Sequence, residues 1–256
     1  MKSKIGLIGF GVIGSYIFRR VEEEGLMEMG FIFEVDRKKT ESVAPSLLLT
    51  SFDDFKKRPV DLVVEAAMPQ VVRELGPRIL KKSDLLIMSL TSLADDDFRQ
   101  EMETIARTSG TKIYIPHGGL VGLDGIHDGR EVIETVQITT TKTPKSLGLK
   151  DKGITRPAVV YDGSTRGACE QFPRNVNTHA SIALLGVGFD KTRTKIVADP
   201  GTKSMSHVIE VQGKGLSWTI KVEALPAGGV TGAYTPESAY QTVRRICVKE
   251  AGLQLA

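Results

Sequence analysis

The 256-residue sequence predicts an α/β fold, with a doubly wound parallel sheet in the N-terminal half and an α+β domain with a mostly antiparallel sheet in the C-terminal half. In the first half, short apolar runs alternate with segments whose apolar residues recur at helical spacing, as in strand–helix–strand units. In the second half, several segments alternate apolar and polar residues, which is typical of strands with one face in solvent.

The expected strands of the first half are short apolar runs, suited to strands that are buried on both faces. The helix after the first strand places Ile13, Ile17 and Val21 on one side. The acidic residues that open the helix at Asp95 are usual at a helix N-terminus. The strands are expected at residues 4–8, 30–35, 61–66, 85–90 and 112–115, and the helices at 12–25, 70–82 and 95–108.

The second half is expected to combine a long-stranded sheet with a few helices. Its strands are predicted at residues 131–142, 192–198, 207–212 and 216–223, a helix at 177–187, a glycine-rich loop at 226–235 and a last helix at 236–249. Glycines crowd between residues 118 and 129, which indicates a domain boundary there. We therefore expect a first domain at residues 1–120, a substrate domain at 121–235, and a C-terminal helix (236–256) that packs back on the first domain.

Composition excludes several classes of protein. The chain has 34 basic and 31 acidic side chains, with no concentrated basic stripe, so a nucleic-acid partner is not expected. No apolar run of about 18 residues suggests a membrane span. Cys169 and Cys247 lack CxxC spacing, so we expect free thiols, no metal and a cytoplasmic location. The apolar N-terminus resembles a signal peptide, but its three glycines and the missing cleavage site favour a buried strand that leads into a helix.

A G-x-G-x-x-G motif follows the first predicted strand and opens the first helix. Gly9 permits the tight turn, Gly11 allows the backbone to approach a pyrophosphate, and Gly14 allows close contact between helix and strand. The helix N-terminus, which begins at Val12 and Ile13, attracts phosphate through its free N–H groups and its dipole. These features together predict a Rossmann domain that binds a dinucleotide.

Two residues at the end of the second strand bear on the choice of cofactor. Asp36 lies 22 residues after Gly14, where a carboxylate can accept both ribose hydroxyls of NAD. Arg37 can stack on the adenine or pair with a 2′-phosphate. We expect NAD as the cofactor, with NADP use possible.

A nicotinamide enzyme needs a proton acceptor near the hydride carbon, and histidine is the usual one. The chain has four histidines: His117, His127, His179 and His207. Several stretches of the second half resemble the L-aspartate dehydrogenase family, and the resemblance covers almost the whole chain. They are Phe172–Asn177 (FPRNVN), Gly186–Asp190 (GVGFD), Ala198–Pro200 (ADP), His207 with Ile209–Val211, and Pro116–Gly119 with Gly122–Gly125.

The resemblance implies that Gly119 and Asn177 bind NAD and that His207 is the catalytic residue. The sequence departs from the family pattern at His117, where serine is usual, at Gly119, where alanine is usual, at Thr178-His179, where small apolar residues are usual, and at Met205, where asparagine is common. A backbone contact at Gly119 survives its change. The added histidines put the substrate in doubt more than the cofactor.

The expected roles are chemically reasonable. The carboxamide of Asn177 can bind the nicotinamide or ribose, although its position also suits a helix N-cap. His207 would take a proton from the substrate ammonium or from water that attacks the imine. The substrate carboxylates need cations or N–H donors, for which Arg174 is a candidate together with Lys142 and Lys203; His179 is a further candidate for the substrate pocket.

The sequence therefore predicts an NAD(P)-dependent L-aspartate dehydrogenase, with a small amino acid as substrate. Iminoaspartate would hydrolyse to oxaloacetate and ammonia or, as the resemblance implies, feed NAD biosynthesis. A homo-oligomer such as a homodimer is expected, with the sheet face at residues 131–142 as a pairing surface. Two alternatives stay open: another dehydrogenase or imine reductase on the same scaffold, and a non-catalytic dinucleotide sensor. A sugar dehydrogenase is disfavoured because Thr91-Ser92-Leu93 stands where such enzymes usually carry Glu-Lys-Pro.

Overall fold

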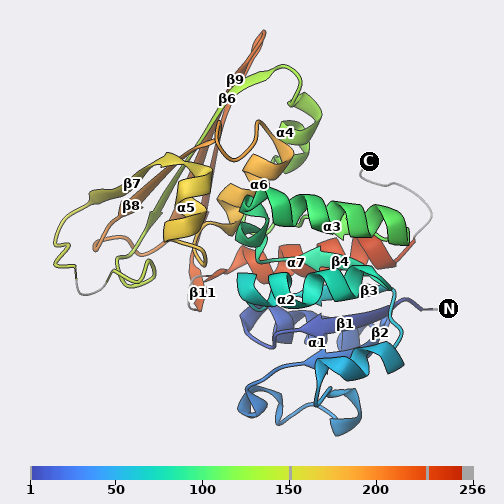
Figure 1. The fold of residues 1–256 in the computed structure, drawn as a ribbon. Coiled ribbons are helices and arrows are strands. Elements are labelled where there is room, and N and C mark those ends of the chain that lie inside the picture. The colour runs from blue at the N-terminus through green and yellow to red at the C-terminus, as the bar shows by residue number, and fades with distance from the viewer. Residues whose placement is uncertain (1, 150–151, 229–230, 250–256) are drawn as a thin grey trace. The chain divides into compact units, whose positions relative to one another are not determined.

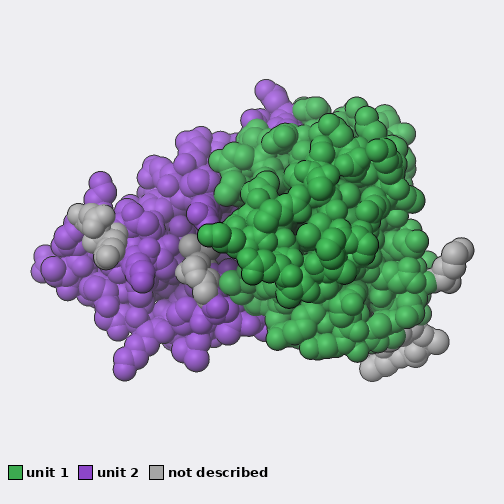
Figure 2. Space-filling model, turned by 90° about the horizontal axis from the view of Figure 1, so that it is seen from below, with its two compact units in different colours: residues 1–88, 100–116, 236–256 green, residues 89–99, 117–235 purple. Residues whose placement is uncertain are grey.

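The computed structural model describes residues 2–149, 152–228 and 231–249. The chain divides into two compact units (Figure 2). Unit 1 comprises residues 1–88, 100–116 and 236–256, and unit 2 comprises residues 89–99 and 117–235. The end of the predicted C-terminal helix, residues 250–256, lies outside the described residues.

Unit 1 contains the predicted parallel sheet (Figure 1). Its strands pair in the order β2-β1-β3-β4-β5, all parallel. Because the strand order reverses next to β1, the turn after β1 lies at the topological switch point, where such sheets bind ligands. The strands are β1 (Lys4–Ile8), β2 (Glu28–Phe33), β3 (Leu62–Glu65), β4 (Asp84–Ile87) and β5 (Ile113–Tyr114), and the helices α1 (Val12–Glu24), α2 (Pro69–Leu80) and α3 (Asp96–Ser109) connect them.

The last helix, α7 (Tyr234–Cys247), completes the core of unit 1. Ala239, Tyr240 and Val243 are fully buried in the cluster that also holds the apolar residues of α1 and β1. Arg20 of α1 pairs with Glu237 of α7 and stacks over the Tyr240 ring, 4.5 Å from its centroid. This helix therefore joins the N-terminal sheet although it is encoded at the other end of the chain.

Unit 2 is built on a mixed sheet with strand order β10-β9-β6-β8-β7. All neighbouring pairs are antiparallel except β6 and β8, so the predicted mostly antiparallel sheet is confirmed. The strands are β6 (Ile133–Lys142), β7 (Ala158–Ser164), β8 (Arg193–Ala198), β9 (Met205–Gly213) and β10 (Leu216–Ala224). The helices of this unit are α4 (Leu123–Gly129), α5 (Thr165–Gln171) and α6 (Asn177–Leu185).

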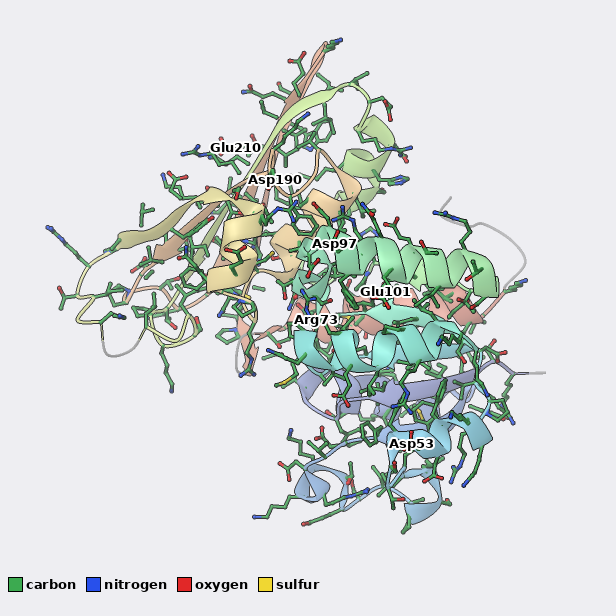
Figure 3. The ribbon with its side chains drawn as sticks, viewed as in Figure 1. Asp53, Arg73, Asp97, Glu101, Asp190 and Glu210 are labelled. Carbon is green, nitrogen blue, oxygen red and sulfur yellow. The ribbon has the colours of Figure 1, made fainter. Side chains whose placement is uncertain are left out.

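Alternation along these strands separates a buried face from an exposed one. On β9, Met205, His207, Ile209 and Val211 are buried, whereas Glu210 is exposed. Glu210, labelled in Figure 3, accepts a hydrogen bond from Gln137 Nε2 of the neighbouring strand at 3.1 Å. The antiparallel register pairs Thr140 with His207, so both side chains point to the buried face. The sheet thereby positions the predicted catalytic histidine inside unit 2.

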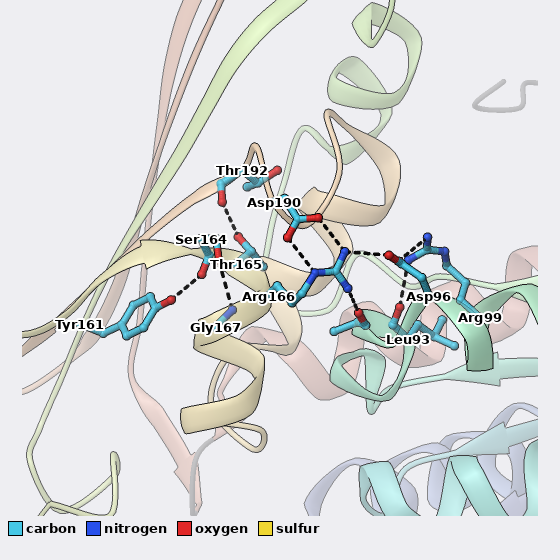
Figure 4. A network of polar contacts seen from close by, with 11 residues as sticks. Leu93, Asp96, Arg99, Tyr161, Ser164, Thr165, Arg166, Gly167, Asp190 and Thr192 are labelled. Carbon is cyan, nitrogen blue, oxygen red and sulfur yellow. Dashed lines mark hydrogen bonds and ion pairs between the residues drawn. The ribbon is translucent and has the colours of Figure 1, made fainter.

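A short segment after β4, residues 89–99, belongs to unit 2, and Arg166 of α5 binds it (Figure 4). The guanidinium pairs with both oxygens of Asp190, at 2.7 and 2.8 Å. It also binds Asp96 Oδ2 at 3.0 Å and the carbonyl of Ala94. Arg166 thus fastens the 3₁₀ turn η4 (Leu90–Ala94) and the start of α3 to unit 2.

Sequence reasoning missed β7, α4 and α5. The segment at residues 226–235, expected to be a loop, contains the short strands β11 (Pro226–Gly228) and β12 (Thr231–Gly232), which pair antiparallel; residues 229–230 lie outside the described chain. Within the described residues, no helix is both long enough and apolar enough to cross a membrane.

Candidate functional site

The glycine turn of unit 1 needs its glycines for different steric reasons. Gly9 has a φ of +90°, and a Cβ there would lie 2.6 Å from the Ala66 carbonyl oxygen. A Cβ on Gly14 would lie 2.1 Å from the Gly9 oxygen. At Gly11, by contrast, no described atom lies within 4 Å of the Cβ position. Gly11 is the N-cap of helix α1, and no side chain of the described residues caps the helix there. Val12, the first helical residue, is 41% exposed, so the first-turn N–H groups can receive a phosphate.

Glu34 organises this turn, and sequence reasoning did not identify it. Its carboxylate is buried, and it accepts hydrogen bonds from Phe10 N at 2.7 Å and from Asp36 N at 2.9 Å. Burial raises the pKa of Glu34, but these N–H donors, with Lys39 nearby, outweigh burial and hold the pKa below its ordinary value. The ionised carboxylate therefore links the glycine turn to the predicted ribose-binding segment. An acidic residue directly after a buried strand was the available signal.

Asp36 and Arg37 lie at the carboxyl end of β2, and both are exposed. Asp36 Oδ1 accepts the N–H of Lys38 at 3.2 Å, which orients the carboxylate at the start of a 3₁₀ turn. Arg37 Nη2 donates to the Leu49 carbonyl at 3.1 Å. Together with the glycine turn, this arrangement fits the adenosine and pyrophosphate parts of a dinucleotide.

In unit 2, His207 is 4% exposed and lies beside a second buried histidine. His207 Nδ1 is 2.7 Å from Thr140 Oγ1, and that hydroxyl is 2.6 Å from His179 Nε2. His179 Nδ1 lies 3.0 Å from Thr194 Oγ1. The structure does not support a direct substrate contact for His179, because its ring is fully buried and hydroxyls occupy both of its nitrogens.

His207 is held neutral. Burial, followed by the positive charge of Lys142, lowers the pKa of His207 to about 3. Burial also lowers the pKa of Lys142 to about 8. Lys142 lies on the same face of β6 as Thr140, and its Nζ donates to the Asn175 carbonyl at 3.4 Å. A neutral imidazole has one nitrogen with a lone pair, which a proton acceptor requires.

A cavity of about 720 Å³ opens beside Lys142 in unit 2. Four cationic residues and no acidic one are found among its described lining residues. The cations are Lys142, Lys145, Arg174 and Lys203, so the three candidate cations from the sequence share one cavity. Asn175 also lines it, and its buried Oδ1 has no hydrogen-bond partner among the described residues. The cavity can therefore hold an anion that also carries a hydrogen-bond donor; His207 itself does not line it.

Asn177 is the first residue of α6, and the N-cap is Val176, so the N-cap alternative for Asn177 is wrong. Its Oδ1 accepts the N–H of Thr91 at 3.2 Å, which leaves the amide group to donate to a ligand. A Cβ on Gly119 would lie 3.9 Å from Thr178 Cγ2 and 3.1 Å from Thr235 Oγ1. Gly119 and Asn177 thus lie at the same end of α6.

The buried Oγ1 of Thr178 has no hydrogen-bond partner among the described residues. This orphaned hydroxyl, the Asn177 amide and the Gly119 backbone fit a polar ring such as a nicotinamide carboxamide. The other two histidines differ in burial. His117 is half-buried, whereas the His127 ring is exposed and lies 3.4 Å from Asp128.

Family models match both halves of the chain. Residues 9–116 match the family model described as homoserine dehydrogenase, NAD binding domain, and residues 124–246 match the one described as aspartate dehydrogenase, C-terminal. The L-aspartate dehydrogenase of Methanosarcina acetivorans is 33% identical over 241 residues, which cover 88% of this chain and 89% of the relative. That of Thermotoga maritima is 32% identical over 244 residues, covering 94% and 95%.

A solved structure of an aspartate dehydrogenase also matches this chain. A crystal structure of aspartate dehydrogenase from Thermotoga maritima matches all of this chain and all of its own, with a TM-score of 0.79 and 28% identity. A hyperthermophilic archaeal homoserine dehydrogenase in complex with NADPH has a TM-score of 0.60 at 11% identity and shows a shared fold. The glycine turn, the buried His207 and these matches over nearly the full length lead to one conclusion: the chain belongs to the L-aspartate dehydrogenase family.

Proposed function

We propose that this protein is an NAD(P)-dependent L-aspartate dehydrogenase in which His207 is the proton acceptor. The observation that carries the proposal is a buried imidazole on the same sheet face as Lys142, which is one of four cationic residues that line one cavity. Neither a polyol nor a sugar would use such a concentration of positive charge. A dicarboxylate would, because each carboxylate needs a cation or N–H donors when it leaves water.

The glycine turn and the α1 N-terminus would hold the pyrophosphate of a dinucleotide, and Asp36 would bind its adenosine ribose. Asp36 favours NAD, since its charge repels a 2′-phosphate, and Arg37 gives a route to NADP use. Gly119, Asn177 and Thr178 are the residues for the nicotinamide end. When bound, the oxidised nicotinamide supplies the acceptor for a hydride.

The substrate's charges match the unit 2 cavity. One carboxylate of L-aspartate pairs with Lys142 and the other with the more exposed Arg174 or Lys203. The carboxylates occupy the cavity, and the ammonium lies outside it at His207, which does not line the cavity. Burial is the larger cause of the lowered His207 pKa and the Lys142 charge the smaller one; an anion beside Lys142 offsets the second, which raises the proton affinity of His207.

His207 then acts as the base, because the substrate ammonium must lose a proton before its nitrogen can form a double bond to Cα. It accepts one proton from the substrate ammonium, and the freed nitrogen lone pair forms the C=N bond as the hydride leaves Cα. The product is iminoaspartate. Addition of water to the C=N bond and loss of ammonia give oxaloacetate, unless a later enzyme of NAD biosynthesis consumes the imine first.

Unit 1 is the dinucleotide domain of this proposal and unit 2 the substrate domain, so residues 89–99 and 117–120, expected in the first domain, belong to the second. We further propose a cytoplasmic homodimer paired through the exposed face of the sheet of unit 2, to which β6 contributes. Sedimentation equilibrium tests this arrangement: charged substitutions at Thr139 and Thr141 on that face would give monomers, and an unchanged mass would exclude the face.

The test of the proposed function is NADH formation from NAD with a panel of substrates. L-Aspartate should be oxidised fastest, and L-asparagine, which lacks the second carboxylate, at least about tenfold less efficiently, because a charged hydrogen bond is worth roughly 1.5–3 kcal/mol. L-Malate, which carries a hydroxyl in place of the amino group, tests whether the reaction requires the amino group. Turnover of malate but not aspartate would indicate a different dehydrogenase, and NADH binding without turnover of any substrate would indicate a sensor.

A further inference from the structure

A line of hydrogen-bonded groups runs through the interior of unit 2 to the His207 ring. It begins at the backbone carbonyl of Thr192, where Thr165 Oγ1 lies at 3.0 Å, a contact drawn in Figure 4. Thr165 Oγ1 is 2.8 Å from Thr194 Oγ1. From Thr194 the line continues through His179 and Thr140 to His207 Nδ1, with steps of 3.0, 2.6 and 2.7 Å. All five side chains are at most 4% exposed.

The carbonyl at the beginning gives this line a direction. A carbonyl oxygen only accepts, so the Thr165 hydroxyl donates its one hydrogen to Thr192. Thr165 Oγ1 must then accept from Thr194, and Thr194 Oγ1 must accept from His179 Nδ1–H. A neutral His179 protonated at Nδ1 has an acceptor at Nε2, so Thr140 donates there.

The same reasoning determines the protonation of His207. The Thr140 hydroxyl has given its hydrogen to His179, so its oxygen accepts from His207 Nδ1–H. The lone pair of the neutral His207 ring is therefore on Nε2. The reverse direction would give His207 a proton on Nε2 and would leave the Thr165 hydroxyl without its bond to the Thr192 carbonyl.

We propose that His179, Thr140, Thr194 and Thr165 are positioning residues that hold His207 in the Nδ1–H tautomer, with Nε2 as the proton acceptor. The proposal rests on the role of His207 in the proposed function. It also gives a role to His179, where the family usually has a small apolar residue.

The carbonyl of Thr192, at which the line of hydrogen bonds ends, excludes proton conduction along this line. A proton taken up at His207 Nε2 cannot travel along these groups and leave at the far end, because the last group is a carbonyl that holds no exchangeable hydrogen. The proton must leave from the side at which it arrived. The line orients a base and does not conduct protons. The wrong histidine tautomer in a catalytic triad lowers kcat by about 10⁴-fold, so tautomer control has a large kinetic effect.

The experiment is nitrogen NMR of the protein labelled with ¹⁵N-histidine, without substrate. Long-range ¹H–¹⁵N spectra distinguish a protonated ring nitrogen from an unprotonated one, and single His→Gln variants assign the four rings. At pH 7 we expect His207 and His179 to be neutral, with the hydrogen on Nδ1 and the lone pair on Nε2. A His207 ring with its hydrogen on Nε2, or a charged ring, would overturn the proposal.

Two threonine variants test the direction of the line. Thr165→Val removes the hydroxyl that donates to the Thr192 carbonyl and keeps the backbone N–H that also donates there, so a population of His207 with its hydrogen on Nε2 should emerge. Thr192→Val keeps the carbonyl and removes only a buried hydroxyl that has no partner among the described residues, so it should leave the tautomer unchanged. Equal spectra for Thr165→Val and the parent protein would contradict the argument.

Kinetics then connect the tautomer to turnover. Thr140→Val should lower kcat by roughly 100-fold or more with little change in the NADH Kd, since it removes the acceptor for His207 Nδ1–H. Thr108→Val, which removes an exposed threonine hydroxyl of α3 in unit 1, is the control and should retain kcat. If no amino acid is oxidised, the proposed function fails while the NMR result still stands; an Nδ1–H ring with an unaffected kcat in Thr140→Val would refute the positioning role.

Discussion

Acidification from pH 7 to pH 5 should destabilise unit 2 by about 4 kcal/mol, because it contains two histidines that stay neutral. Burial lowers the pKa of His207 to about 3, and burial, His207 and Lys142 lower that of His179 well below 6.5. In the unfolded chain both titrate near 6.5. Over this interval the unfolded state therefore binds more protons than the folded state, so stability falls as the pH falls.

The magnitude follows from the unfolded state alone. At pH 5 a free imidazole is almost fully protonated, and linkage gives a loss of about 2 kcal/mol for each histidine that cannot protonate in the folded state. Carboxylates with lowered pKa values, such as Glu34, act mainly below this interval, since they lose their stabilising effect only as the pH falls below about 4.5.

The assay is urea unfolding at pH 7 and pH 5, followed by the fluorescence of Trp218, the one tryptophan of the chain. Trp218 packs against the core of unit 2, so its signal reports on the unit that contains both histidines. His179→Gln should reduce the pH-dependent change by about half, or about 2 kcal/mol, and His127→Gln, which replaces an exposed ring, should not. The reasoning would be refuted if the free energy of unfolding of the parent protein were the same at the two pH values. It would also be refuted if this free energy changed equally with pH in His179→Gln and His127→Gln.

Three further substitutions test the cofactor and substrate residues. Asp36→Ala should weaken NAD binding by roughly tenfold or more and relax discrimination against NADP, measured by fluorescence titration; tighter NAD binding would contradict the ribose assignment. Glu34→Gln leaves one acceptor for two N–H donors, so it should destabilise unit 1 by about 1–3 kcal/mol in thermal unfolding and raise the NADH Kd; an unchanged Kd would exclude Glu34 from positioning the glycine turn. Lys142→Met should raise KM for L-aspartate by roughly 10- to 100-fold with the NADH Kd unchanged, and an unaffected KM would remove Lys142 from the substrate site.

The parallel sheet was predictable from the sequence because strands buried on both faces read as apolar runs. The missed elements lack that signal. The edge strand β7 has no fully buried position, so its apolar and polar residues follow no clean alternation. Helices α4 and α5 have seven residues each and contain glycines, which disfavour a helix in isolation.

The candidate site was predictable only where one residue type implies one role. The glycine motif and Asp36 have fixed spacing, and His207 lies in a recognisable stretch of sequence. The partnership between His179 and Thr140 spans 39 residues and depends on strand register, which a single sequence does not encode visibly. The same holds for Glu34, whose role depends on the backbone N–H groups that surround it.

The most direct test of the account compares two properties of His207→Ala: the Kd for NADH and kcat for L-aspartate. The dinucleotide residues of unit 1 do not include His207, so NADH should bind with nearly unchanged affinity. Loss of the proton acceptor should lower kcat by at least about 100-fold. A variant that turns over L-aspartate at the parent rate would contradict the central claim that His207 accepts the substrate proton.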